Sequence, residues 1–198
     1  MPLASKRIAI ILGHPDPDPG RFGRALADAY AHGARDGGHD IRTIDVASLE
    51  FPLLRTQDEW LNGKLPESLE DAQATIQWAN HLVIFYPLWL GNMPARLKGF
   101  LEQVLRPGFA LTYGGPAGLP KKLLTGKSAR IVVTMGMPAF FYRWYFRAHS
   151  LKSLQRNILG FCGIRPIRST LVGTIQGGGR VRHELFLQQI RLLGQRGI

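Results

Sequence analysis

Cysteine is nearly absent from this 198-residue chain, and no apolar run is long. The single cysteine, Cys162, excludes an intramolecular disulfide framework and a metal site built from several cysteines, and it suits a reducing compartment. The longest apolar run, residues 82–90, is too short and too interrupted by Pro87 to span a bilayer. The first residues place basic side chains directly before a short apolar run, without a cleavage site, which indicates a strand and not a signal peptide. We therefore expect a soluble cytoplasmic protein.

Acidic residues are scarce relative to basic ones, since 14 Asp and Glu stand against 25 Lys and Arg, for a net charge of +11. Such an excess can provide solubility, attract phosphorylated small molecules or bind nucleic acid. The basic residues are scattered, and no zinc-finger spacing, RNA-binding motif or basic helix accompanies them. We expect a solvated surface first and an anionic cofactor second, with no nucleic-acid partner; a basic nucleic-acid-binding protein is the alternative outside this class.

Strand and helix patterns alternate along the whole chain. Apolar runs indicate strands, and apolar positions recurring every three or four residues indicate the helices between them. The predicted strands cover residues 8–12, 41–46, 82–86, 129–134 and 167–175. Because no linker, repeat or composition break interrupts this pattern, it predicts one domain over residues 1–198, with its core at about 6–195. The architecture is α/β, a parallel sheet with helices on both faces.

Ligands bind such sheets at the carboxyl ends of the strands, so the residues after each strand are the candidates. After the first strand, His14 and Arg21 flank a helix start whose first amides, near residues 21–24, are unpaired and carry the positive end of the helix dipole. A phosphate site and a plain turn with a solvent-facing histidine are equally compatible with this spacing. The dinucleotide fingerprint Gly-x-Gly-x-x-Gly is missing, and the sequence TGKS at 125–128 precedes a strand, which argues against a P-loop.

Aromatic side chains follow the next two strand ends. Trp89 is either a core residue or a stacking platform for a flat ligand, and for a lone Trp the core position is favoured. Gly91 permits close approach of the backbone to such a ligand. Six of the seven residues at 140–146 are aromatic, so some must line a pocket or a subunit interface. Tyr142 and His149 are titratable groups suited to proton donation, although His149 is equally compatible with a surface helix position. The Gly- and Pro-rich segment 107–127 is long enough to suggest a functional loop.

A phosphate site, a flat stacking surface and aromatic walls at successive strand ends favour a flavin nucleotide. The sequence resembles the NAD(P)H:quinone oxidoreductase (DT-diaphorase-like) family of flavodoxin-like flavoproteins over roughly residues 6–175. The motifs that carry the resemblance are ILGHPDP and RFGRAL after the first strand, YPLWLGNMPARLKGFLEQVLRPGFA after the third, and TMGM with Tyr142 after the fourth. The resemblance implies a flavodoxin-like, doubly wound, five-stranded parallel sheet in the order 2-1-3-4-5.

The resemblance also implies which residues bind the flavin, in three groups. Those at the phosphates are His14, Arg21, Phe22 and Gly23. Those along the isoalloxazine ring are Pro87, Leu88, Trp89, Leu90 and Gly91. Those at the pyrimidine side of the ring are Thr134, Met135, Gly136 and Met137. Tyr142 corresponds to a tyrosine that assists charge stabilisation of the reduced flavin, and His149 corresponds to its histidine partner with one residue inserted before it.

Two departures from the family pattern affect these assignments. The family has a small polar residue near position 20 and often an Asn at 23, whereas both are Gly here. Phosphate contacts would then depend on backbone amides, His14 and Arg21. The loop after the fourth strand reads Thr-Met-Gly-Met instead of Thr-Thr-Gly-Gly, which makes the pocket bulkier and more apolar.

The implied activity is two-electron transfer of hydride from NAD(P)H through the flavin, FMN or FAD, to a quinone-like acceptor at one site. A homodimer with the site at the subunit interface would account for the aromatic run. The alternatives are a regulatory flavoprotein subunit of a potassium-efflux transporter, with peripheral contact to that membrane partner, and an FMN reductase or azoreductase. The sequence does not decide between FMN and FAD or between NADH and NADPH.

Overall fold

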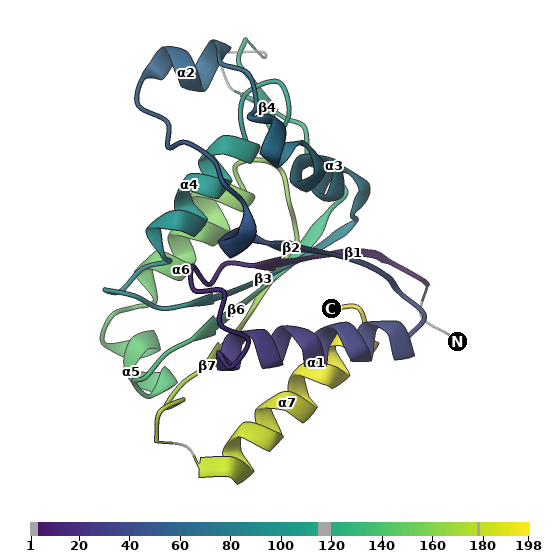
Figure 1. The fold of residues 1–198 in the computed structure, drawn as a ribbon, viewed down its shortest axis with the longest axis vertical. Helices are drawn as coiled ribbons and strands as arrows, with labels where there is room; N and C mark the ends of the chain where they lie inside the picture. The colour runs from purple at the N-terminus through teal and green to yellow at the C-terminus, as the bar shows by residue number, and fades with distance from the viewer. Residues whose placement is uncertain (1–3, 115–119, 178) are drawn as a thin grey trace.

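Five parallel strands form the centre of the molecule in the order β2-β1-β3-β6-β7 (Figure 1). The computed structural model describes residues 4–114, 120–177 and 179–198. The strand bounds are β1 Arg7–Leu12, β2 Asp40–Asp45, β3 His81–Pro87, β6 Ser128–Thr134 and β7 Ile167–Val172. When β4 and β5, which belong to a separate short pair, are left out and the five strands are numbered along the chain, this order is 2-1-3-4-5. The predicted sheet is therefore confirmed.

Helices cover both faces of the sheet (Figure 1). Their bounds are α1 Phe22–Asp36, α2 Gln57–Asn62, α3 Glu70–Trp78, α4 Ala95–Val104, α5 Ala139–Trp144, α6 His149–Ser153 and α7 Gly179–Gln195. Short 3-10 turns at Val46–Ser48 and Glu67–Leu69 and a π-helical turn, η4, at Leu154–Leu159 complete the described elements. One layer is α1 with α7, and the other contains α3, α4 and the α6–η4 segment.

The apolar core is divided by the sheet into two parts. On one face, Ile8 and Val83 pack with Leu26 and Tyr30 of α1 and Ile190 of α7. On the other face, the core is larger and joins strand residues to α3, α4, α6 and η4. All residues of the central strand β3 are buried, as expected for a strand covered on both faces.

Close glycine contacts fix α1 against α7. A Cβ at Gly33 would lie 1.9 Å from the Arg191 carbonyl oxygen, and one at Gly194 would lie 2.1 Å from that of Tyr30. Only residues without a side chain permit this approach. The crossing holds α1 under the sheet, and thereby places the N-terminal end of α1 beside the carboxyl ends of β1 and β3.

The structure differs from the predicted elements in three places. The segment 107–127 contains a small antiparallel pair, β4 Leu111–Thr112 and β5 Lys121–Lys122, and its residues 115–119 lie outside the described part. The residues from 139 to 159, between the fourth and fifth predicted strands, form three separate short helical segments, α5, α6 and η4. The last strand ends at Val172, because Gly173 and Thr174 turn toward the loop that follows β6.

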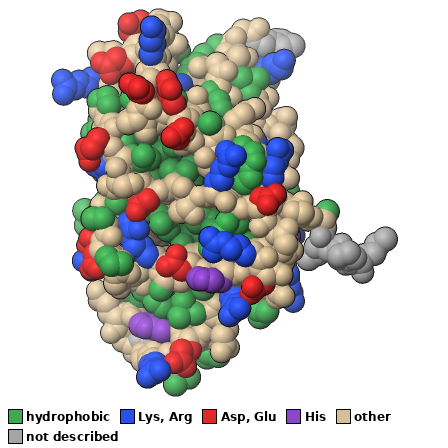
Figure 2. Space-filling view, turned by 45° about the vertical axis from the view of Figure 1, so that its right-hand side comes forward, with side chains coloured by type: hydrophobic (Ala, Val, Ile, Leu, Met, Phe, Trp, Pro, Cys, Tyr) green, Lys and Arg blue, Asp and Glu red, His purple; other side chains and the backbone are tan. Residues whose placement is uncertain are grey.

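The surface mixes charges of both signs. On the face shown in Figure 2, Lys and Arg side chains are interspersed with Asp and Glu. Exposed pairs such as Arg191–Asp36, at 2.8 Å, add little to stability but disperse the positive charge. Among the described residues, no helix has the length and apolar character needed to cross a membrane.

Candidate functional site

The carboxyl ends of β1 and β3 bring the first two predicted groups together. The His14 and Trp89 rings lie with their centroids 5.7 Å apart and their planes at 81°, in an edge-to-face arrangement. His14, Gly23 and Pro87 all line a small hollow of about 10 Å³ at this edge. A ligand would therefore lie on a shallow surface and not inside a deep cavity of one chain.

The N-terminal end of α1 is open to an anion. Its N-cap residue, Arg21, makes no side-chain cap, and the first turn holds no acidic residue. A Cβ added at Gly23 would meet no atom within 4 Å, so the space above this residue is free. The amides of Phe22 and Gly23 precede the first backbone hydrogen bonds of the helix and carry its positive dipole end. The donors and the free space fit a phosphate group.

The basic side chains at this edge are already paired. Arg21 contacts Asp16 at 2.5 Å and Asp18 at 3.5 Å, and half of its side chain is exposed. Arg24 forms a two-pronged contact with Asp45 at 2.7 and 3.0 Å, and this hydrogen bonding raises the pKa of Arg24. The positive potential available to a ligand therefore comes mainly from the backbone amides, and Arg21 contributes less free charge than the sequence predicted.

His14 has a defined tautomer. Its Nδ1 accepts a hydrogen bond from the Asp16 amide at 3.0 Å. Partial burial lowers the pKa of His14, with smaller contributions in the same direction from Arg21 and Arg24, while Asp16 acts in the opposite direction. At neutral pH the ring is therefore uncharged with its proton on Nε2, which is available to donate to a ligand oxygen.

The loop after β3 presents Trp89 on a tight turn. Trp89 and Asn92 exchange both backbone hydrogen bonds at 2.9 Å, and the two residues between them, Leu90 and Gly91, have φ of 45° and 77°. This is the pattern of a type I′ turn, for which Leu is a poor residue. Trp89 is 49% exposed and Leu90 is fully exposed, so neither belongs to the core. Pro87, in contrast, is buried at the end of β3.

The loop after β6 lies beside this turn. The Leu88 amide donates to the Thr134 carbonyl at 2.8 Å, which joins the ends of β3 and β6. Thr134 and Met135 are buried, and the Met135 amide donates to Val172. Met135 therefore serves the core and the sheet, which corrects its predicted contact with a ligand. The Gly136 and Met137 amides have no acceptor among the described residues, so they remain available as donors.

Tyr142 is the clearest correction to the predicted site. It is 1% exposed, its hydroxyl lies 2.7 Å from Ser150 Oγ, and it accepts a hydrogen bond from the Leu151 amide. The hydroxyl thus fixes the start of α6 within the core and is not placed to give a proton to a surface ligand. His149 is exposed at the first position of α6, outside this hydrogen-bond group.

The aromatic run leaves several rings uncovered. Phe140, Trp144 and Tyr145 are 74%, 84% and 65% exposed. Phe141 stacks on Tyr145 with the ring centroids 4.9 Å apart, so part of the run packs against itself. The expectation that one chain does not bury all of these rings is therefore correct.

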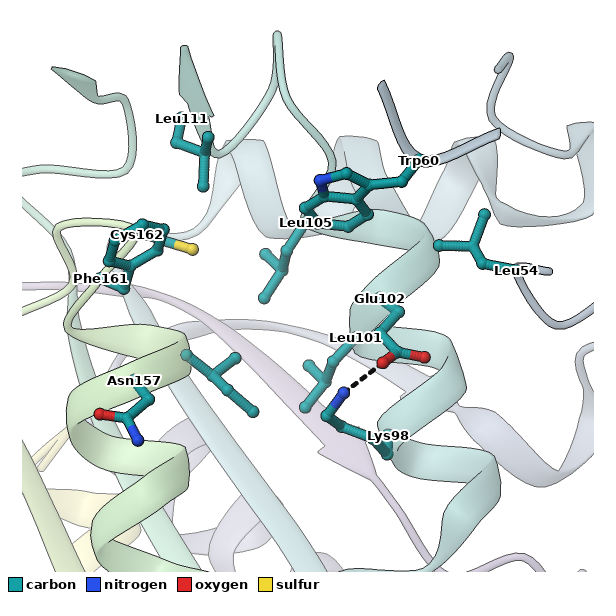
Figure 3. A pocket seen from close by; sticks show the side chains of 11 residues that line it. Leu54, Trp60, Lys98, Leu101, Glu102, Leu105, Leu111, Asn157, Phe161 and Cys162 are labelled. Carbon is teal, nitrogen blue, oxygen red and sulfur yellow. Dashed lines mark hydrogen bonds and ion pairs between the residues drawn. The ribbon is translucent and has the colours of Figure 1, made fainter. Parts of the chain in front are cut away.

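An apolar cavity lies elsewhere in the molecule (Figure 3). Its volume is about 410 Å³, and it lies between α4, α2 and η4, with Trp60, Leu101, Leu105 and Phe161 in its walls and the Lys98–Glu102 ion pair at its side. Sequence reasoning did not find it, because its residues come from segments without a shared motif. It is separate from the strand-end surface, and a flavin site is not assigned to it.

Three further residues of the strand-end surface were missed by the sequence. Asn92 closes the Trp89 turn, Asp45 holds Arg24, and Gln176 places its side-chain oxygen 3.5 Å from a Cβ built on Gly136. The first would have been accessible to reasoning from turn chemistry. The other two are brought in from β2 and from the segment after β7, and no local signal marks them.

The fold and this surface define a doubly wound α/β protein whose candidate site lies at the strand ends. A family model described as a flavodoxin-like fold matches residues 6–191, and the chain belongs to this family. An uncharacterised NAD(P)H oxidoreductase of Haemophilus influenzae is 30% identical over 170 residues, which cover 84% of this chain and 83% of that protein. An FMN-dependent NADH:quinone oxidoreductase of Nitratidesulfovibrio vulgaris is 29% identical over 173 residues, which cover 78% of this chain and 80% of that protein.

Solved structures agree with this assignment of the fold. An NAD(P)H:quinone oxidoreductase from Methanothermobacter marburgensis has a TM-score of 0.82, with 24% sequence identity over 97% of this chain and 98% of that chain. At this level of identity the similarity establishes the fold. Together with the sequence relatives, it confirms the resemblance to NAD(P)H:quinone oxidoreductases.

Proposed function

We propose that this protein is a flavin-dependent oxidoreductase that transfers hydride from NAD(P)H to a quinone-like acceptor. The observation that carries the proposal is the contact between His14 and Trp89, which unites the open N-terminal end of α1 with an exposed aromatic platform at the next strand end. The names of the relatives, oxidoreductases of NAD(P)H and of quinones, agree with this reading.

The residues of the three loops have separate tasks in holding the flavin. The Phe22 and Gly23 amides and the Nε2 proton of His14 bind the phosphate, with Arg21 at its outer side. The 87–91 segment lies along the ring system, with Trp89 as the aromatic contact. The free amides of Gly136 and Met137 face its polar edge. A bound flavin supplies a ring that accepts two electrons as hydride and passes them to a second substrate.

The chain contributes orientation and electrostatics to this chemistry. Fixed amides at 136 and 137 stabilise negative charge without reorganising, because the Met135 amide and the Met137 carbonyl, which bonds Thr174, hold the loop in place. The exposed aromatic side chains of residues 140–146 restrict access of water. The substrates exchange at the shallow surface, since the hollow there cannot enclose both at once.

Three finer features belong to the same proposal. FMN is the proposed flavin, because a relative with 29% identity depends on it. A homodimer in the cytoplasm is proposed because Phe140, Trp144 and Tyr145 need a partner surface. Both NADH and NADPH are proposed as hydride donors. Peripheral contact with a membrane transporter is a further part of the proposal.

The test is the visible absorption spectrum of the purified protein loaded with FMN. We expect binding of one FMN per chain, anaerobic bleaching by NADPH or NADH, and return of the colour on addition of a quinone. Riboflavin, which lacks the phosphate, should bind more weakly by about 10-fold or more, since charge-assisted hydrogen bonds are lost. A protein that binds neither flavin, or a bound flavin that neither nucleotide bleaches, contradicts the proposal.

A further inference from the structure

Basic side chains gather at the amino edge of the sheet, opposite the strand-end surface. Lys6 is the residue directly before β1. Ile8 lies two positions after Lys6 and pairs in register with His81 of β3. His81 pairs with Ser128 of β6, and Arg130 pairs with Arg168 of β7. Side chains two positions apart share a face, so Lys6, His81, Ser128, Arg130 and Arg168 form one row on the α1–α7 face. We call this row the basic row.

No Asp or Glu side chain pairs with the basic row among the described residues, and the terminal carboxylate belongs to Ile198, a residue that lines the same cavity but forms no ion pair with the row. None of the ion pairs among the described residues includes Lys6, Arg130 or Arg168. The Lys6 ammonium donates to the Gly197 carbonyl at 2.7 Å, which is a neutral acceptor. Like charges on directly opposed strand positions, as at 130 and 168, are destabilising. An anion would relieve this repulsion.

Arg130 adds a buried charge without a counterion. Its side chain is 6% exposed, Nη1 donates to Thr170 Oγ1 at 2.7 Å, and Nε has no hydrogen-bond partner among the described residues. Burial, and to a smaller extent the charge of Arg168, lowers the pKa of this guanidinium, while Tyr30 acts in the opposite direction. Leaving a charged group buried and unpaired costs several kcal/mol in a folded protein.

His81 is the second buried group that lacks a partner. It is 3% exposed, its Nδ1 lies 2.7 Å from Ser128 Oγ, and its Nε2 has no partner in the described structure. Burial first, and then the charges of Lys6, Arg130, Arg168 and His39, lower the pKa of His81 to about 3. Orphaned buried polar atoms are rare and indicate a missing partner.

A cavity of about 190 Å³ lies in the basic row, and it is lined by Lys6, His81, Ser128 and Arg168 together with Ala129, Pro166 and the C-terminal residue Ile198. This volume is below the roughly 300–1,000 Å³ of pockets that enclose drug-sized ligands. It suits a compact anion with a few waters, because one water occupies about 30 Å³ of liquid. The strands of six or seven residues separate this cavity from the flavin surface by about 20 Å.

We propose that the cavity at the amino edge binds a small oxyanion, such as inorganic phosphate or sulfate, on Lys6, His81, Ser128 and Arg168. Lys6 and Arg168 supply charge, and the Ser128 hydroxyl donates a hydrogen bond. His81 donates from Nε2 once a proton is drawn onto its ring by the anion. Arg130 strengthens the field from within the sheet. The anion binds the folded chain only, because strand register assembles the row. The proposal does not depend on the flavin.

The test is thermal unfolding of the purified protein at constant ionic strength, with potassium chloride replaced stepwise by phosphate or sulfate. We expect the Tm to rise by about 5 °C when the anion is present at about 20 times its Kd, as follows for one bound anion in a chain of this size. Arg168→Gln and Lys6→Gln should raise the Tm in chloride, because repulsion is removed, and should lose most of the response. Arg165→Gln, an exposed neighbour outside the cavity, should keep the full response.

Two results would overturn the proposal. One is an equal stabilisation of wild type and Arg168→Gln by phosphate, which indicates general solvent effects. The other is an unmoved His81 side-chain resonance in NMR when phosphate is added, with the resonance identified from His81→Gln. An FMN arm separates the two proposals, since Arg168→Gln should still be stabilised by FMN through the opposite edge.

Discussion

The two edges of the parallel sheet hold positive charge in different ways. At the carboxyl edge, the arginines are neutralised by Asp16, Asp18 and Asp45, and the free donors are backbone amides. At the amino edge, Lys6, Arg130 and Arg168 form no ion pair with a carboxylate among the described residues, and the donors are side chains. The first edge is prepared to receive an anion at no cost in repulsion, whereas the second is destabilised until an anion arrives.

This comparison indicates that the net charge of a chain is a poor guide to where an anion binds. The chain carries +11, yet the groups that we propose for the phosphate at its strand-end surface are helix amides and the neutral ring of His14. Substitutions at the carboxyl edge should therefore alter flavin binding with little effect on stability. Substitutions at the amino edge should alter stability with little effect on the flavin.

The largest effect is expected from Gly23→Asp. The new carboxylate would face a bound phosphate across the free space above this residue, and such a pair at about 4 Å repels by about 4 kcal/mol at an effective dielectric constant near 20. We expect FMN affinity to fall by about 100-fold or more in a fluorescence titration. The Tm should not fall, because an acid in the first turn stabilises a helix.

Gly23→Ala is the matched control. Its methyl group meets no neighbour, and Ala is favoured over Gly in a helix by about 1 kcal/mol, so stability should rise while FMN affinity stays within a few-fold. If both variants lose FMN binding, the free space above residue 23 is required because of the volume of the added side chain and not because of its charge.

The next effect is a loss of stability in acid through His81. The pKa of this residue is about 3 in the folded chain and about 6.5 when unfolded, so the unfolded chain binds a proton first as the pH falls. Stability is therefore lost from about pH 6.5 down to about pH 3, and His81 accounts for about 2 kcal/mol between pH 7 and pH 5. Urea unfolding at both pH values measures it.

His81→Gln should flatten this pH dependence, whereas substitution of the exposed His32 by Gln should leave it unchanged. Phosphate should also flatten it in the wild type, since the anion stabilises the protonated ring. An unaltered slope in His81→Gln would assign the acid sensitivity to other groups.

Trp89→Ala should weaken FMN binding by about 10-fold, because stacking on an aromatic side chain contributes about 1–3 kcal/mol per ring. Stability should change little, because half of this side chain is exposed. Trp60→Ala, in the wall of the apolar cavity of Figure 3, should leave FMN affinity unchanged. If an FMN titration shows weaker binding for Trp60→Ala and unchanged binding for Trp89→Ala, the flavin site lies in that cavity instead.

The smallest effect concerns Leu90. An L-residue in the left-handed region costs about 1–2 kcal/mol, and Asn tolerates that region in type I′ turns, so Leu90→Asn should stabilise the fold by about 1 kcal/mol. Leu90→Ala should bring no such gain, because Ala bears the same backbone strain. Equal stabilities of Leu90→Asn and Leu90→Ala in urea would contradict the turn assignment.

The sheet could be predicted because the strand signals are local, whereas its strand order was implied by the resemblance to the family. Runs such as residues 8–12 and 82–86 are apolar throughout, and helix periodicity separates them, which is sufficient for a parallel sheet. The strand-end surface followed from the same argument. His14, Gly23 and Trp89 are brought together there because they directly follow strands or open a helix.

The errors arose where side-chain direction decides. Tyr142 lies in a run of exposed rings, yet the helical turn of α5 points it into the core, where Ser150 and the Leu151 amide bind its hydroxyl. Met135 is still part of the ladder with β7. The basic row was hidden because its members come from three strands and from the residue before β1, and only strand register places Arg130 opposite Arg168.

The most direct measurement is an NMR titration of ¹⁵N-labelled protein with FMN and with riboflavin. The phosphate should shift the Phe22 and Gly23 amides strongly with FMN and weakly with riboflavin, while the Trp89 indole should shift with both. The amides of Lys6, His81 and Arg168 should stay unchanged at equimolar ligand. Shifts at the amino edge in place of residues 22, 23 and 89 would contradict the account.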